Sequence, residues 1–258
     1  MNHTRSIVRC LLPLALASLC DGVLGQQIQV VHPQGCAHGF VEVTTLQGTR
    51  VAVGDFSQRL RGDMMTSRLS MRFLDGSLDD ETTIYRQGRA FHFISDHHIQ
   101  RGPSFSKPVD VTIDAARSLV VTNDANGRKT QAHVDMPPEV YNGLATTLLM
   151  NWRPSMPEMK IAVVVAAASP RIVHLSIKPV GKVPVTIGGM SRTTTDYLVH
   201  VELGGVAGVI APLLVREPLD HHVLILSGDD PAFIREEGTL YEGGPVLRIQ
   251  QISAVFGD

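Results

Sequence analysis

The sequence has few cysteines, few aromatic residues and no excess of basic residues. Among its 258 residues are three Cys and one Trp, aromatic residues make up 5%, and the formal net charge is −2. Nucleic-acid-binding proteins normally carry a basic stripe, so we expect no nucleic-acid partner. A run of about 18 or more apolar residues, which a transmembrane helix needs, is absent, and we expect no transmembrane segment. The composition is otherwise that of a globular chain, which excludes disordered, collagen-like and coiled-coil proteins.

Recognisable catalytic motifs are missing as well. The sequence contains no G-x-S-x-G nucleophile turn, no H-E-x-x-H zinc helix and no glycine-rich phosphate or dinucleotide loop. The adjacent carboxylates at positions 79–81 follow a turn, where such clusters are usually solvated. We therefore expect a non-enzymatic protein without a cofactor.

Residues 1–25 are predicted to be a secretory signal peptide. Two arginines precede an apolar run, Cys10–Cys20, whose eleven residues are too short to span a bilayer as a helix. Small residues at Val23 and Gly25 favour cleavage after Gly25, and we expect an exported protein, periplasmic or secreted. Cleavage would leave Cys36 as the single cysteine, which excludes an intramolecular disulfide and thus a disulfide scaffold.

The remaining residues, 26–258, have the pattern of one β-rich domain. Apolar and polar residues alternate over 64–74, and the dipeptides Asp75-Gly76 and Asn126-Gly127 are typical of hairpin turns. Strands joined by such short turns pair antiparallel. We predict a mainly β fold, a long antiparallel meander of about 12–14 strands that forms a half-barrel or partly closed barrel. The segments 161–168 and 206–215 are apolar on both faces, which indicates strands covered on both sides, although a helix over 161–168 is an alternative.

One amphipathic helix is predicted over about 137–152. Val140, Leu144, Leu148 and Trp152 repeat every four residues, and Tyr141 lies beside them. A single helix in a β chain must bury its apolar stripe against the sheet.

Two triplets of sequence Asp-His-His, at 96–98 and 220–222, suggest a metal site. In a regular strand over 89–101, His92, Asp96 and His98 would share one face, with His97 on the other. Histidine and carboxylate side chains are ligands of zinc and iron. A metal-dependent hydrolase using Asp96, His98 and His222 is therefore an alternative hypothesis, which requires the two segments to meet. If the two segments do not meet, the Asp and His residues of the triplets are polar side chains on a solvent-exposed face of the sheet.

The leading hypothesis is the binding of a lipid or another hydrophobic or amphiphilic ligand. A curved sheet crossed by one helix can leave an apolar cavity between them. Tyr141, Leu144, Leu148 and Trp152 would line it, or would simply form the core. A scaffold of the cell envelope is the companion hypothesis. A third hypothesis is partner binding by edge-strand addition, because an unclosed meander has two free edges.

Two segments resemble an uncharacterised group of exported bacterial β-meander proteins, a domain of unknown function. They are the stretch from Gly54 to Phe105, which includes SRLSMRFLDGSLDDETTIY, and YEGGPVLRIQ at 241–250. The resemblance implies the meander fold and no catalytic residue. More loosely, the predicted architecture is similar to the periplasmic lipoprotein-carrier half-barrels of the LolA/LolB type, and function does not follow from such a likeness of fold.

Overall fold

A computed structural model describes residues 27–153, 156–165, 170–202 and 219–252, which contain fourteen strands and one short helix. The predicted signal peptide and the predicted strand over 206–215 lie outside the described residues. The elements are β1 (Ala37–Thr45), β2 (Arg50–Arg61), β3 (Met64–Phe73), β4 (Leu78–Gln87), β5 (Phe91–Arg101), β6 (Val109–Asp114), β7 (Leu119–Asn123), β8 (Lys129–His133), α1 (Ala145–Met150), β9 (Met159–Val165), β10 (Arg171–Ile187), β11 (Met190–Glu202), β12 (His221–Leu226), β13 (Phe233–Thr239) and β14 (Val246–Ile252).

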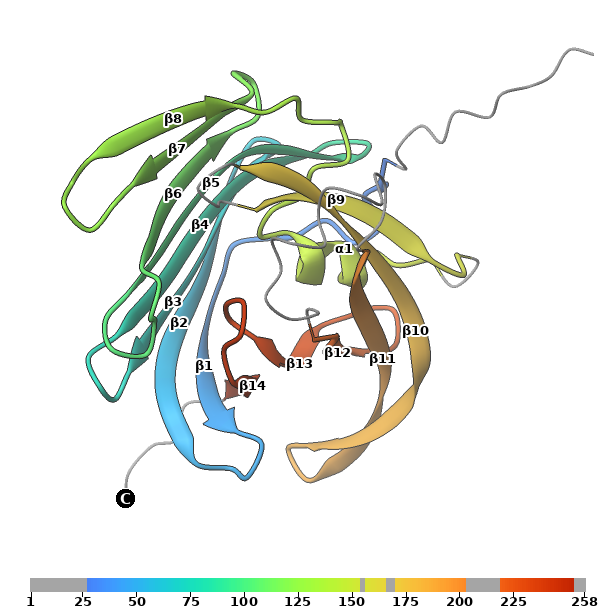
Figure 1. Ribbon diagram of the computed structural model, residues 1–258. Helices are drawn as coiled ribbons and strands as arrows, with labels where there is room; N and C mark the ends of the chain where they lie inside the picture. Colours follow the sequence, from blue (N-terminus) through green and yellow to red (C-terminus); the bar gives the residue numbers. More distant parts are fainter. Residues whose placement is uncertain (1–26, 154–155, 166–169, 203–218, 253–258) are drawn as a thin grey trace, which may run out of the picture.

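The strands form one antiparallel sheet in the order β8-β7-β6-β5-β4-β3-β2-β1-β14-β13-β12-β11-β10-β9. Each strand pairs with its neighbour in sequence except at the centre, where the first strand pairs with the last, from Phe40 opposite Ile252 to Thr45 opposite Leu247. The sheet curves around α1 and is not closed, because β8 and β9 do not pair (Figure 1). This confirms the predicted antiparallel meander with one helix, and it shows that 159–165 is a strand.

The helix is shorter than the sequence pattern predicts. Only Ala145–Met150 are helical, and the residues before them take their backbone hydrogen bonds elsewhere. The N–H of Tyr141 donates to the carbonyl of Ala162 (2.9 Å), and the N–H of Ala162 donates to the carbonyl of Glu139 (3.0 Å). Gly143 then has a φ of +65°, a left-handed conformation that a right-handed helix cannot include. The predicted helix over 137–152 is thus mostly a segment that lies along β9.

That segment also covers one of the two edges of the sheet. The side-chain amide of Asn142 accepts a hydrogen bond from the N–H of Val164 (2.8 Å) and donates one to the carbonyl of the same residue (2.9 Å). A peptide group of a further strand would bond in the same way, so the edge of β9 is blocked here by the chain itself. The opposite edge strand, β8, is short, and its exposed side chains are polar.

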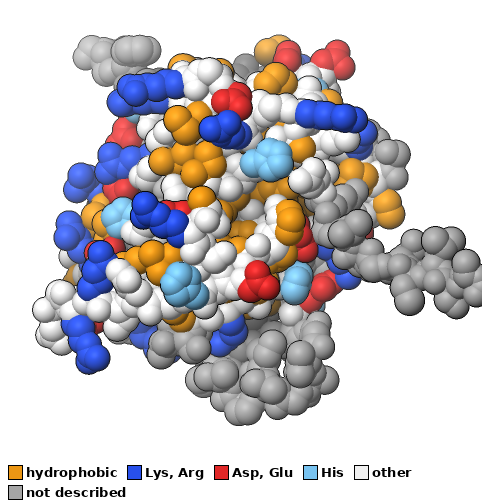
Figure 2. Space-filling view, turned by 90° about the horizontal axis from the view of Figure 1, so that it is seen from above, with side chains coloured by type: hydrophobic (Ala, Val, Ile, Leu, Met, Phe, Trp, Pro, Cys, Tyr) orange, Lys and Arg blue, Asp and Glu red, His pale blue; other side chains and the backbone are white. Residues whose placement is uncertain are grey.

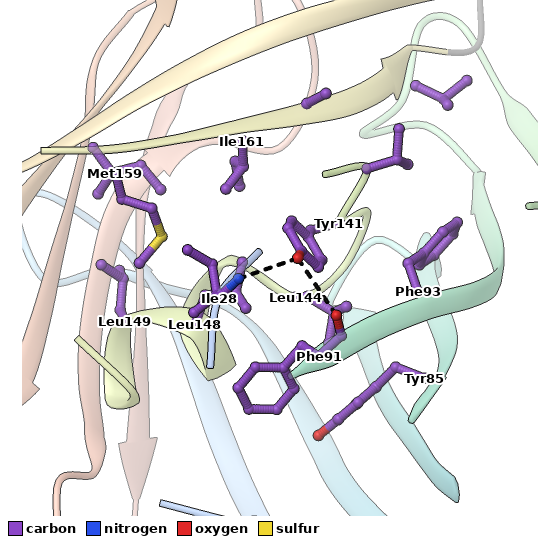
Figure 3. Packing of buried hydrophobic residues seen from close by; sticks show 14 of the residues in the cluster. Ile28, Tyr85, Phe91, Phe93, Tyr141, Leu144, Leu148, Leu149, Met159 and Ile161 are labelled. Atoms are coloured by element: carbon purple, nitrogen blue, oxygen red, sulfur yellow. Dashed lines mark hydrogen bonds between the residues drawn. The ribbon is translucent and has the colours of Figure 1, made fainter. Parts of the chain in front are cut away.

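The main core lies between α1 with its flanking segments and the concave face of the sheet (Figure 3). At its centre, the hydroxyl of Tyr141 accepts a hydrogen bond from the N–H of Ile28 and donates one to the carbonyl of Phe91, both at 3.4 Å. A second, smaller cluster around Phe73, Phe105 and Leu247 fills another part of the sheet. The Tyr141 hydroxyl thus joins three separate segments in the interior.

The outer surface seen from above mixes hydrophobic patches with Lys, Arg and His side chains (Figure 2). In the part of the chain that the structure describes, no helix has the length and apolar character to cross a bilayer.

Two buried tyrosines allow a matched test of this core. Tyr141→Phe removes two hydrogen bonds, and we expect it to lower the free energy of unfolding by about 1 kcal/mol. The Tyr85 side chain is fully buried, and its hydroxyl interacts with the Thr147 side chain without forming a well-aligned hydrogen bond to any described residue. Tyr85→Phe should therefore cost less stability than Tyr141→Phe. Urea unfolding of the two variants measures the difference, and equal losses would contradict the assignment.

Candidate functional site

A group of buried and half-buried polar residues lies on the inner faces of β4 and β5. Cross-strand pairing places Asp79 opposite Gln100, Glu81 opposite His98 and Thr83 opposite Asp96. Paired residues of an antiparallel sheet lie on the same face, so all six side chains point to the concave side. We call this set the inner polar cluster: Asp79, Glu81, Thr83, Asp96, His98 and Gln100.

A β-bulge in β5 creates this arrangement. The register shifts between the pairs Ile84–Ser95 and Tyr85–Phe93, which leaves Ile94 as the extra residue. Because a bulge reverses the alternation of side chains, Phe93 shares the inner face with Asp96. The expected common face of His92, Asp96 and His98 is therefore wrong: His92 is exposed on the outer face, as is His97. The expectation that 79–81 is solvated is also wrong for Asp79, of which only 3% is exposed.

Hydrogen bonds fix the cluster. The Nε2–H of His98 donates to Asp79 Oδ1 (2.8 Å), and Gln100 Nε2 donates to Asp79 Oδ2 (2.9 Å) and to the carbonyl of Leu240 (2.9 Å). The hydroxyl of Thr83 donates to Asp96 Oδ1 at 2.8 Å. These side chains hold defined positions in the interior.

The backbone of Gly143 packs against Thr83 and Asp96. A Cβ at this position would collide with the hydroxyl of Thr83 and would lie 3.3 Å from Asp96 Oδ1. The segment before α1 therefore packs its backbone directly against the cluster.

Burial and mutual charge shift the pKa values of the cluster upward. Burial, with a contribution from the charge of Asp96, raises the pKa of Glu81 to about 8. Burial raises the pKa of Asp96 to about 6, against the opposing hydrogen bond from Thr83. Burial disfavours the charged form of His98, but the hydrogen bond to Asp79 and the charges of Glu81, Asp79 and Asp96 outweigh it and raise its pKa to about 9. His98 is thus protonated at neutral pH and cannot act there as a general base.

His221 and Glu236 form a half-buried pair in the other half of the sheet. His221 Nδ1–H donates to Glu236 Oε1 at 2.9 Å, and the charge of Glu236 contributes to the raised pKa of Glu81. Burial opposes the charged form of His221, but the Glu236 hydrogen bond raises its pKa. Gly238 is required opposite His221, because a Cβ there would overlap the imidazole ring.

The structure does not bring the predicted metal ligands Asp96, His98 and His222 together. His222 pairs with Glu237 and Leu198 on the outer face of β12 and contacts Asp196 at 3.1 Å, whereas Asp96 and His98 are on the inner face. The alternation of β12 places His221, not His222, inside. Among the residues that the structure describes, no group of three His, Cys, Asp or Glu side chains is arranged to hold a metal ion.

A pocket of about 480 Å³ beside α1 is the second feature. Such a volume is typical of small-molecule sites, which span about 300–1,000 Å³. Its apolar part includes Leu149, Ile225, and the rings of Trp152 and Tyr197, whose centroids are 5.2 Å apart. Lys182 also lines the pocket.

The ammonium of Lys182 is held by hydroxyl groups only. Lys182 Nζ donates to Thr195 Oγ1 (2.6 Å) and Ser227 Oγ (3.0 Å), and no carboxylate among the described residues forms an ion pair with it. The pocket therefore combines an aromatic, apolar wall with one uncompensated positive charge.

Of the four predicted ligand-binding residues, only Trp152 lines this pocket. Tyr141, Leu144 and Leu148 are at most 1% exposed and belong to the main core. The sequence analysis did not predict Lys182 or Tyr197 as pocket residues. The alternation of apolar and polar residues over 196–203 could have placed Tyr197 on the inner face. It could not have placed Lys182, which follows a register shift at Pro179–Gly181.

No known family model matches the chain, and no curated protein matches it. Among solved structures, the chain is similar to a crystal structure described as a beta-barrel-like protein of domain of unknown function DUF1849 from Brucella abortus, with a TM-score of 0.47 and 8% sequence identity. The match covers 86% of this chain and 98% of that one. Like the resemblance noted from the sequence, it is to a bacterial protein of unknown function.

The inner polar cluster makes stability depend on pH in a defined direction. The pKa values of Asp96 (about 6, from 3.8), Glu81 (about 8, from 4.5) and His98 (about 9, from 6.5) are all raised by folding. The folded state then binds more protons than the unfolded state, so the free energy of unfolding falls as the pH rises through these values.

Glu81→Gln tests this directly. Because the neutral amide cannot ionise, we expect the variant to show a shallower fall of stability from about pH 5 to about pH 9 and to exceed the wild type by on the order of 1–2 kcal/mol at the alkaline end. Chemical unfolding at a series of pH values is the measurement. Glu242→Gln, at an exposed site, is the control, and a parallel pH profile for Glu81→Gln and wild type would contradict the assignment.

Proposed function

We propose that the protein is an exported, non-enzymatic binding protein for an amphiphilic small molecule, with the pocket beside α1 as its site. The observation that supports this is the pairing of an apolar wall, formed by Trp152 and Tyr197, with the ammonium of Lys182 in one pocket. An apolar body with an anionic head, such as a long-chain carboxylate, matches both parts. A mostly apolar lining with a few polar groups in defined positions is typical of ligand sites.

The position of the pocket supports the same proposal. Pro179, Gly181 and Lys182 come from β10, Ile225 from β12, and Leu149 from α1, so three elements that are distant in sequence converge there. Sites formed between packed rigid elements hold their shape better than sites on single loops.

Partner binding by edge-strand addition remains a second proposal, restricted by the fold. The edge of β9 is occupied at Val164 by Asn142. An added strand would therefore pair with β8 (Lys129–His133), whose short, polar edge offers a weak template.

Tryptophan fluorescence gives a specific assay, because Trp152 is the single tryptophan. A brominated long-chain fatty acid bound in the pocket should quench its emission with a saturable dependence on concentration. Lys182→Gln should weaken binding of the fatty acid about tenfold, since it removes a charge-assisted hydrogen bond. The same variant should bind the corresponding fatty alcohol as the wild type does.

The matched control is Lys129→Gln, an exposed lysine on β8 outside the pocket. If the wild type shows no quenching, ligand binding at this site is wrong and the scaffold hypothesis takes its place. If quenching is unchanged by Lys182→Gln, the proposed role of the ammonium is wrong.

A further inference from the structure

The distal part of the β10–β11 hairpin is a ribbon without neighbours in the sheet. β9 pairs with β10 only over Arg171–Ile177, and β12 pairs with β11 only over Thr194–Val199. Residues 184–193, which we call the distal ribbon, therefore form strand pairs only with one another, from Pro184 opposite Thr193 to Ile187 opposite Met190. In Figure 1 the ribbon runs down the right-hand side to a tip at the bottom of the view. A two-stranded ribbon is only marginally stable on its own, so a surface that covers it would stabilise it.

The tip of this ribbon is apolar on one face. The pairs Val185–Arg192 and Ile187–Met190 place these side chains together, whereas Thr186 and Ser191 point to the other face. Ile187 is 40% exposed and Met190 55% exposed. Positive φ angles at Gly188 and Gly189 form the tight turn between them, so two large apolar side chains stand next to each other at the end of the hairpin.

The ribbon lies within the most one-sidedly charged part of the chain. From 159 to 195 there is no Asp or Glu and there are five Lys or Arg residues, although the whole protein has a net charge of −2. Lys160 has a partner in Glu202 at 2.7 Å. Lys178, Lys182 and Arg192 have no ion pair with any carboxylate among the described residues. Of these three cations, Arg192 belongs to the distal ribbon, and Lys178 and Lys182 precede it in β10.

We propose that the distal ribbon docks on an anionic lipid surface. Ile187 and Met190 would enter the headgroup region, while Arg192, opposite Val185 in the same ribbon, would meet lipid phosphates. Apolar side chains flanked by basic ones are the general signature of interfacial membrane binding. A second copy of this chain is a poorer occupant, because it would bring the same uncompensated cations together.

The pocket lies outside the distal ribbon. Its lining residues Pro179, Gly181 and Lys182 precede the ribbon in β10. The inference does not depend on the proposed ligand, because its residues Ile187, Met190 and Arg192 do not line the pocket.

The test is flotation of the purified protein with vesicles. We expect binding to vesicles of phosphatidylglycerol mixed with phosphatidylcholine, little binding to pure phosphatidylcholine, and loss of binding at high salt. The double variant Ile187→Ser with Met190→Ser should reduce the partition coefficient about tenfold or more. Arg192→Gln should reduce it about fivefold.

Matched control variants distinguish specific docking of the ribbon from non-specific adsorption to vesicles. Leu74, 74% exposed in the turn between β3 and β4, is the control apolar residue (Leu74→Ser), and Lys129→Gln is the control cation. The circular dichroism spectrum and thermal unfolding establish that each variant is folded. Failure of the wild type to float with anionic vesicles overturns the proposal, as does equal flotation of the ribbon and control variants. A third outcome is dimerisation without lipid that increases with protein concentration. If the double variant Ile187→Ser with Met190→Ser abolishes such dimerisation, the ribbon binds a second copy of the chain and not a lipid surface.

Discussion

The pairing of β1 with β14 is the constraint on which the rest of the architecture depends. Every other strand pair joins neighbours in sequence and can form from a local hairpin, whereas this one joins strands roughly 200 residues apart. It places both terminal strands in the middle of the sheet and moves the two free edges to β8 and β9. Because β8 and β9 are consecutive in sequence, one segment connects the two edges, and it crosses the concave side of the sheet, where α1 lies (Figure 1).

That crossing explains why the interior contains a short helix and not a long one. The connecting segment must satisfy its polar backbone groups within the interior, and it does so against β9 before it turns into α1. Asn151 completes the fit at the far end, where its Oδ1 accepts hydrogen bonds from the N–H groups of Val31 (2.8 Å) and His32 (2.7 Å). The chain before β1 is thereby fixed to the segment after α1.

Much of this fold could be predicted from the sequence, because hairpin signals are local. Asp75-Gly76 and Asn126-Gly127 mark turns in which the glycine has a positive φ, and the strands around them follow. The burial of Val140, Tyr141, Leu144 and Leu148 also follows from their spacing, but their spacing does not determine the backbone conformation. Helical spacing and a turn that lies on an edge strand bury the same residues. The backbone hydrogen bonds of Ala162 and the positive φ of Gly143 distinguish them.

The candidate sites were harder to predict, for a physical reason that differs between them. The inner polar cluster depends on one inserted residue, Ile94, and a bulge has no distinct composition. Without it, alternation assigns Asp96 and His98 to the face of His92. The pocket depends on contacts between β10, β12 and α1, which no local pattern records.

The two sites are nevertheless joined by one short piece of chain. Gly143 lies against Thr83 and Asp96, and Trp152, nine residues later, faces Tyr197 in the pocket. No side chain fits at Gly143, so the distance between this backbone and the cluster is fixed by direct contact. Leu144 and Leu148 are fully buried between these two points and leave no room for the segment to shift independently. The position of the aromatic wall of the pocket is therefore set, through α1, by the same packing that holds the buried carboxylates.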